Sequence, residues 1–125
     1  MNVLIFGNPL IEKDNLALRL LDKLKRRFSN IKFKEIEPTE KLEKYGRDLI
    51  IIDCVENVDK VVLIEDLESL KLDKLFSMHD FDLGYNLRLL KKVGKIDSVK
   101  IIGVPMDMDE EEAFREVEKI IKTIF

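Results

Sequence analysis

The most apolar run in the chain, Leu49-Ile50-Ile51-Ile52, strongly limits the folds that this sequence can adopt. The run is rich in β-branched side chains and is followed by Asp53. A strand that is apolar at every position is buried on both faces, which is typical of a parallel sheet covered by helices on either side. The run therefore predicts a central strand of an α/β domain, ending at Asp53.

Other segments of the chain alternate between strand and helix patterns. Further strands are predicted at 3–6, 31–36, 60–64 and 99–104, a short helical piece at 40–45, and helices at 15–28 and 81–92 and after Asp109. Asp109 and Glu112 have the spacing of a capping box, and the acidic residues there suit the first turn of a helix. This alternation predicts a single domain over residues 1–125, with a five-stranded, mostly parallel, twisted sheet flanked by helices on both faces.

Charge and cysteine content exclude several classes of protein. Lys and Arg number 22 against 25 for Asp and Glu, so the chain lacks the basic surplus of a general nucleic-acid binder. A single cysteine excludes an intramolecular disulfide framework and a multi-cysteine zinc site. No apolar run approaches the roughly 18 residues of a membrane span, and no secretory signal is predicted. We therefore expect a cytoplasmic protein with no membrane span and no nucleic-acid partner.

Polar residues are expected at the carboxyl ends of several strands, where open parallel sheets bind ligands, and three of them could form a ligand set. They are Asp14, Asp53 and His79. Two carboxylates and one imidazole suit a borderline divalent cation such as nickel, zinc or cadmium, and three protein ligands leave positions open for water or substrate. The loop after the first strand has one glycine and lacks a P-loop ending, so no tightly held organic cofactor is expected.

Each of these residues also has a simpler structural explanation. Asp14 or Asn15 suits the N-cap of the first helix, Asp53 suits a strand end bonded to turn amides, and His79 suits an ordinary loop histidine. Cys54 is expected to be a small buried residue, because no basic neighbour in the sequence activates its thiol. The residue types and spacing alone leave both explanations open.

Four short blocks occur in a fixed order along almost the whole chain. They are Gly7-Asn8-Pro9-Leu10-Ile11-Glu12-Lys13-Asp14, Leu49-Ile50-Ile51-Ile52-Asp53-Cys54, Ser77-Met78-His79-Asp80 and Ile101-Ile102-Gly103-Val104-Pro105. This ordered set resembles the hydrogenase maturation proteases, the endopeptidases that trim the large subunits of nickel–iron hydrogenases.

The resemblance implies removal of the C-terminal extension from a large-subunit precursor after nickel has been inserted. It carries over Asp14, Asp53 and His79 as metal-contacting and catalytic residues, and Gly7 and Asn8 as substrate-binding residues. The precursor, which is the implied partner, would supply the nickel, and other divalent cations are expected to fit the same site. A monomer is favoured.

The chain departs from the pattern of the family at Ile5, Lys13, Asn15 and Ala17. An alternative function is therefore a non-catalytic α/β binding module or an assembly chaperone that holds the precursor without cutting it. A small flavodoxin-like or nucleotide-binding domain is a third reading. Metal binding that depends on the three site residues would disfavour the flavodoxin-like or nucleotide-binding domain. Cleavage of the precursor would distinguish the endopeptidase from the binding module or chaperone.

Overall fold

The structure, a computed structural model, describes residues 2–6, 16–36, 40–65 and 81–125, with the side chains of 81–83 left out. Its strands are β1 (Asn2–Ile5), β2 (Lys32–Glu35), β3 (Asp48–Val55), β4 (Val62–Ile64) and β5 (Ser98–Pro105). Its helices are α1 (Leu16–Arg19), α2 (Leu21–Arg27), the 3₁₀ turn η2 (Leu42–Tyr45), α4 (Phe81–Lys92) and α5 (Glu110–Ile124). No helix in these ranges is long and apolar enough to cross a membrane.

The five strands form one sheet in the order β2-β1-β3-β5-β4. The first four strands in that order are parallel, and β4 pairs antiparallel with β5 at one edge. The prediction of a five-stranded, mostly parallel sheet is confirmed. The all-apolar segment of β3 lies at the centre of the sheet, as its composition requires.

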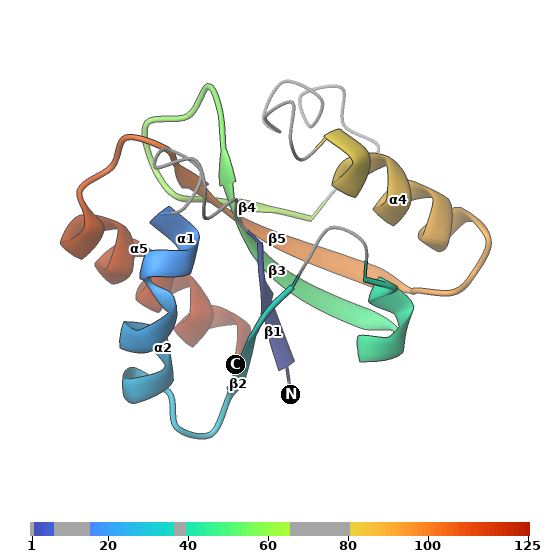
Figure 1. Cartoon of the computed structure of the whole chain (residues 1–125), viewed down its shortest axis with the longest axis horizontal. Coiled ribbons are helices and arrows are strands. Elements are labelled where there is room, and N and C mark those ends of the chain that lie inside the picture. The colour runs from blue at the N-terminus through green and yellow to red at the C-terminus, as the bar shows by residue number, and fades with distance from the viewer. Residues whose placement is uncertain (1, 7–15, 37–39, 66–80) are drawn as a thin grey trace.

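Helices cover both faces of this sheet (Figure 1). Side chains alternate between the faces along β3, so Ile50, Ile52 and Cys54 pack on one side while Ile51 and Val55 pack on the other. The first side is covered by α1, α2 and α5, through residues that include Leu16, Leu20, Leu24, Ala113, Val117 and Ile121. The second side is covered by α4 and η2, through Leu87 and Leu42, and by Ile96 in the connection that follows α4.

Two strands are longer than the sequence predicts. β3 was expected to end at Asp53 but continues to Val55, and β5 was expected to stop before Pro105 but includes it. The two strands pair residue by residue from Asp48 with Ser98 to Val55 with Pro105. This pairing, which joins distant parts of the chain, extends both strands, and proline is tolerated at the end of a strand. Asp53 therefore lies within β3 and not after it.

The helices follow their predicted boundaries closely. The helix expected at 81–92 is α4, with Leu87 fully buried, and α5 begins after Asp109, whose side chain accepts a hydrogen bond from Glu112 N at 3.2 Å. The helix expected at 15–28 is divided at Leu20 into α1 and α2. Its expected N-caps, Asp14 and Asn15, lie outside the described residues.

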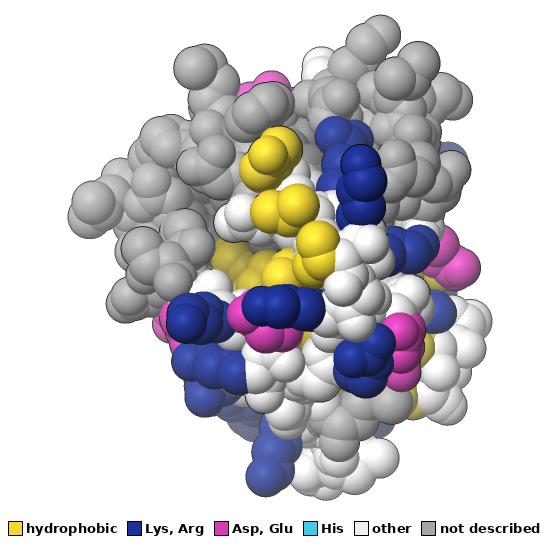
Figure 2. Space-filling view, turned by 90° about the vertical axis from the view of Figure 1, so that its right-hand side faces the viewer, with side chains coloured by type: hydrophobic (Ala, Val, Ile, Leu, Met, Phe, Trp, Pro, Cys, Tyr) yellow, Lys and Arg dark blue, Asp and Glu magenta, His cyan; other side chains and the backbone are white. Residues whose placement is uncertain are grey.

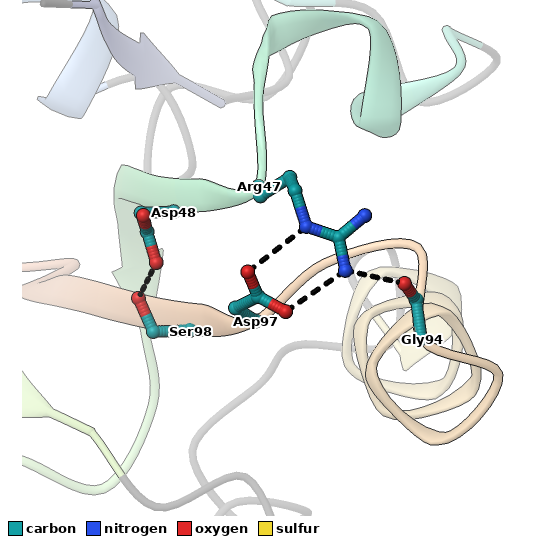
Figure 3. A network of polar contacts seen from close by, with 5 residues as sticks. All are labelled: Arg47, Asp48, Gly94, Asp97 and Ser98. Atoms are coloured by element: carbon teal, nitrogen blue, oxygen red, sulfur yellow. Dashed lines mark hydrogen bonds and ion pairs between the residues drawn. The ribbon is translucent and has the colours of Figure 1, made fainter.

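A polar network joins α4 to the amino ends of β3 and β5 (Figure 3). Arg47 Nε and Nη2 donate to the two carboxylate oxygens of Asp97, each at 2.9 Å, and Nη2 also donates to Gly94 O at 2.6 Å. Gly94 lies two residues after the end of α4 and has a φ of 81°, a left-handed conformation that favours glycine. The network thus fixes the end of α4 against the amino edge of the sheet.

This ion pair is expected to make stability pH-dependent in acid. The hydrogen bond from Arg47 lowers the pKa of Asp97 below its ordinary value of 3.8. A lowered carboxyl pKa adds stability that is present above the ordinary value and is lost as the pH falls through the folded value. The effect is small because the side chains are 57% and 59% exposed.

An Asp97→Asn variant should therefore unfold at lower urea concentration than the wild type at pH 7. The difference between their midpoints should shrink as the pH falls below about 4, since protonated Asp97 resembles asparagine. All other carboxyl groups are common to both proteins, so the difference isolates this pair. The opposite result is a difference between the two urea midpoints that stays the same from pH 7 down to about pH 2.5, which is roughly one unit or more below the ordinary pKa of aspartate. That result would contradict a stabilising ion pair between Arg47 and Asp97.

Candidate functional site

Asp53 is the one charged side chain that is fully buried in the described part of the chain. It lies two residues before the end of β3, at the carboxyl edge of the parallel strands. The alternation along β3 places its side chain on the face of the sheet that α4 covers, with Ile51 and Val55. On the next strand in the sheet, Phe6 N donates to Ile52 O at 2.9 Å, which brings the end of β1 beside Asp53.

A buried carboxylate at this position is not explained by packing. Removing an ionised carboxylate from water costs several kcal/mol, which an apolar side chain in the same place would avoid. Aspartate is rarely buried fully, so a buried one is more informative than an exposed one. The carboxyl ends of the strands are where open α/β sheets bind ligands. Asp53 is therefore the strongest candidate for a functional side chain among the described residues.

Gly103 lies opposite Asp53 on β5 and gives that carboxylate a neighbour without a side chain. A Cβ atom at Gly103 would lie 2.8 Å from Val55 Cγ2 and 3.1 Å from Val62 Cγ2. Contacts this short require the neighbours to move, so the sheet accepts only glycine here without rearrangement. The glycine of the fourth sequence block thus has a steric reason, and it lies directly beside the candidate site.

A groove of about 610 Å³ opens at the same edge of the sheet, between the β3–β4 loop and the β5–α5 loop. Its described lining consists of Val55, Glu56, Asn57, Val58, Asp59, Pro105, Met106, Asp107, Met108, Asp109 and Glu112. Five of these side chains are acidic and none is basic. Val61 N donates to Glu116 Oε1 at 3.3 Å, which holds the β3–β4 connection against α5.

The groove was not predicted from the sequence. The acidic residues near Asp109 were expected only as the first turn of the last helix, and the segment at 56–59 had no assigned role. The two loops are brought together because Val55 pairs with Pro105 at the ends of β3 and β5. No spacing along the chain shows that pairing.

Cys54 lies on the opposite face of β3 from Asp53. Its thiol is fully buried, and its sulfur accepts a hydrogen bond from Ala17 N at 3.4 Å. This contact joins β3 to α1. The prediction of a small buried cysteine is confirmed.

The remaining predicted site residues, Gly7, Asn8, Asp14 and His79, lie outside the described residues. Within the described ranges, no group of three or more His, Cys, Asp or Glu side chains is arranged to hold a metal ion. The structure therefore places Asp53 alone of the expected set, and the three-residue ligand set stays a prediction.

The chain is similar to one protein family by sequence. The sequence model of that family, described as hydrogenase maturation protease, matches residues 34–125. Asp53, His79 and Gly103 fall inside the matched range, and Asp14 precedes it. No curated protein sequence matches the chain.

Three solved structures have the same fold at low sequence identity. The solution structure of the endopeptidase HycI from Escherichia coli has a TM-score of 0.63 and 19% identity, covering 98% of this chain and 90% of that one. An uncharacterized protein from Wolinella succinogenes has a TM-score of 0.61 and 13% identity, covering 98% and 94%. The hydrogenase 2 maturation peptidase from a Thaumarchaeota archaeon has a TM-score of 0.51 and 18% identity, covering 99% and 97%.

Proposed function

The chain belongs to the hydrogenase maturation protease family, and on that premise we propose that it is an endopeptidase acting on a nickel–iron hydrogenase large-subunit precursor. The reaction proposed is hydrolysis of the peptide bond that joins the C-terminal extension to the rest of the precursor. The observation that carries the proposal is the fully buried Asp53 at the carboxyl end of the central strand.

The proposed substrate is a precursor that already carries nickel, so the metal arrives as part of the substrate. Asp53 is proposed to contact that nickel together with Asp14 and His79, because carboxylate and imidazole ligands suit it. Asp53 fits this role as an oxygen ligand at the sheet edge where ligands bind. Gly7 and Asn8 are proposed to contact the substrate chain. No organic cofactor is needed for this chemistry, and other divalent cations are expected to bind the same three side chains.

The groove beside β3 and β5 supports the proposal by its position. It begins at Val55, two residues beyond Asp53, and its volume of about 610 Å³ is in the range of binding pockets. An extended precursor segment held there would be presented to the carboxyl edge of the sheet. Holding the scissile bond in place supplies much of the rate of such a reaction.

A cleavage assay on the hydrogenase large-subunit precursors of the same host tests this function. Each precursor is incubated with the protein, with and without nickel, and its intact mass is measured. We expect loss of the C-terminal extension from the nickel-loaded precursor alone, and no loss with the His79→Ala variant. Tight binding without any change in mass would instead indicate the chaperone function. If the protein neither binds nor cleaves any of the precursors, the proposal is contradicted.

A further inference from the structure

The outer face of α4 carries a row of exposed apolar side chains. Tyr85, Leu89 and Val93 are 61%, 46% and 59% exposed, and we call them the α4 stripe. They are spaced four residues apart, which places them on one side of a helix. Val93 N donates to Leu89 O at 3.0 Å, so the helical turn continues to Val93 although α4 ends at Lys92. The stripe is about 12 Å long, at 1.5 Å per residue.

The α4 stripe is not required for the fold. The inner side of α4 packs on the sheet through Leu87, which is fully buried. Of the five large hydrophobic side chains that are exposed in the described residues, three belong to the stripe. Figure 2 shows apolar side chains in a line on this face of the molecule. Single exposed apolar residues are ordinary, whereas a contiguous row marks a binding surface.

Basic side chains border the α4 stripe. Arg88 follows Tyr85 by three residues and Lys92 follows Leu89 by three, so each lies next to the row on the helix surface. Residues 84–95 contain four basic residues and no acidic one, although the chain as a whole has a net charge of −3. Dark blue side chains lie beside the yellow row in Figure 2. The described part of α4 is thus apolar along the stripe and rich in basic side chains beside it.

We propose that the α4 stripe is a docking surface for the hydrogenase large-subunit precursor, and that it binds a precursor segment with apolar side chains bordered by Asp or Glu. This inference rests on the proposed function. Charge complementarity favours such a partner, because opposite charges at the border of an interface steer association and set the register. A narrow apolar row with charged borders also matches a partner helix that packs along α4.

Two other occupants fit less well. A symmetric dimer through this face would place Arg88 and Lys92 of one copy against the same residues of the other, since such an interface pairs a surface with itself. Like charges there would oppose association. Membrane binding by a helix needs a wide apolar face to enter the lipid, and the inner side of α4 is already committed to the sheet.

The far end of the α4 stripe lies away from the proposed cleavage site, although α4 begins at Phe81, two residues after His79. α4 ends beside Gly94, which Arg47 holds at the amino edge of the sheet, whereas Asp53 lies at the carboxyl edge. Contacts at Leu89 and Val93, in the last turns of the helix, would therefore raise the affinity for the whole precursor without taking part in the hydrolysis. This separation makes the proposal testable by binding measurements apart from the chemistry.

The test measures the dissociation constant for the nickel-loaded precursor by titration calorimetry, using Asp53→Asn protein, which is expected to cut it only slowly. Adding Leu89→Asp and Lys92→Glu should weaken binding about ten-fold or more. Adding Lys119→Glu, on an exposed position of α5, should leave the affinity unchanged. Far-ultraviolet circular dichroism checks that each variant is folded. The affinity of the parent protein should also fall more steeply with salt than that of the α4 variant.

Equal affinity of the α4 variant and its parent would overturn the inference while the proposed function stands, provided that wild-type protein still cleaves the precursor. A precursor that is neither bound nor cleaved by the wild type would instead overturn the proposed function. Stripe-dependent binding to vesicles containing anionic phosphatidylserine, without stripe-dependent precursor binding, would overturn the inference in favour of a membrane. Stripe-dependent dimerisation in analytical ultracentrifugation, again without precursor binding, would overturn it in favour of a second copy.

Discussion

Replacing Asp53 with asparagine is expected to slow cleavage of the nickel-loaded precursor by about 10²–10⁴-fold, the usual contribution of a positioned acid or base. Asparagine has nearly the same volume, so it fills the buried place beside Ile51 and Val55. It lacks the negative charge with which aspartate binds a metal or accepts a proton. The measurement is the initial rate of loss of the C-terminal extension, read by intact mass at saturating precursor.

The matched control is Asp48→Asn, the same chemical change at the other end of the same strand. Asp48 is exposed and accepts a hydrogen bond from Ser98 Oγ at 2.7 Å. Its carboxylate is at the amino edge of the sheet, so its replacement should leave the cleavage rate unchanged. Full activity of the Asp53→Asn variant would remove Asp53 from the proposed site. Equal losses in both variants would indicate damage to β3 rather than to a functional group.

The sheet and the helices could be predicted because their signals are local. The run at 49–52 is apolar at every position, which requires cover on both faces. Asp109 and Glu112 mark the start of α5 within four consecutive residues, and the structure shows the cap that their spacing predicts. The helix predicted at 81–92 has Leu83, Leu87 and Leu90 on one face; Leu87 is buried and Leu90 half-buried, and the side chain of Leu83 lies outside the described residues.

The candidate site could be predicted only in part because its parts meet through distant pairings. Asp53 was found because it follows an apolar run, but its place inside β3 depends on pairing with β5, which begins 50 residues after the start of β3. The groove depends on the same pairing. The α4 stripe was not predicted from the sequence. The apolar period of a helix indicates which residues face the core, and it gives no function to the apolar residues on the other side. The site roles of Asp14 and His79 stay predictions, and only His79 lies within the range that the family model matches.

A Gly103→Ala substitution is expected to lower the free energy of unfolding by about 1–3 kcal/mol, the usual cost of overpacking a buried site. The added methyl group would lie 2.8 Å from Val55 Cγ2, inside van der Waals contact. Urea denaturation followed by circular dichroism measures the change. Gly94→Ala is the contrasting variant, because Gly94 has a φ of 81° and open space around its Cα. Its cost of about 1–2 kcal/mol would come from the backbone conformation and not from a neighbour.

A second substitution separates these two causes. Val55→Ala removes Cγ1 and Cγ2 of Val55, the two methyl groups of that residue that a Cβ at position 103 would contact. Combined with Gly103→Ala, it should cost at least about 1 kcal/mol less than the sum of the single changes, since contacting residues couple. When Val55→Ala is combined with Gly94→Ala, the two losses in free energy of unfolding should add. Additive costs in both pairs would mean that Gly103 is not confined by Val55.

The cleavage rate of the Gly103→Ala, Val55→Ala protein then shows what the glycine is for. Gly103 pairs with Asp53 across the two central strands, so a methyl group there would stand beside the carboxylate whether or not Val55 has been trimmed. If this double variant cleaves the precursor more slowly than Val55→Ala alone, the missing side chain serves the site by keeping the surface next to Asp53 open. If it cleaves as fast as Val55→Ala alone, Gly103 is needed only because Val55 and Val62 leave no room for more.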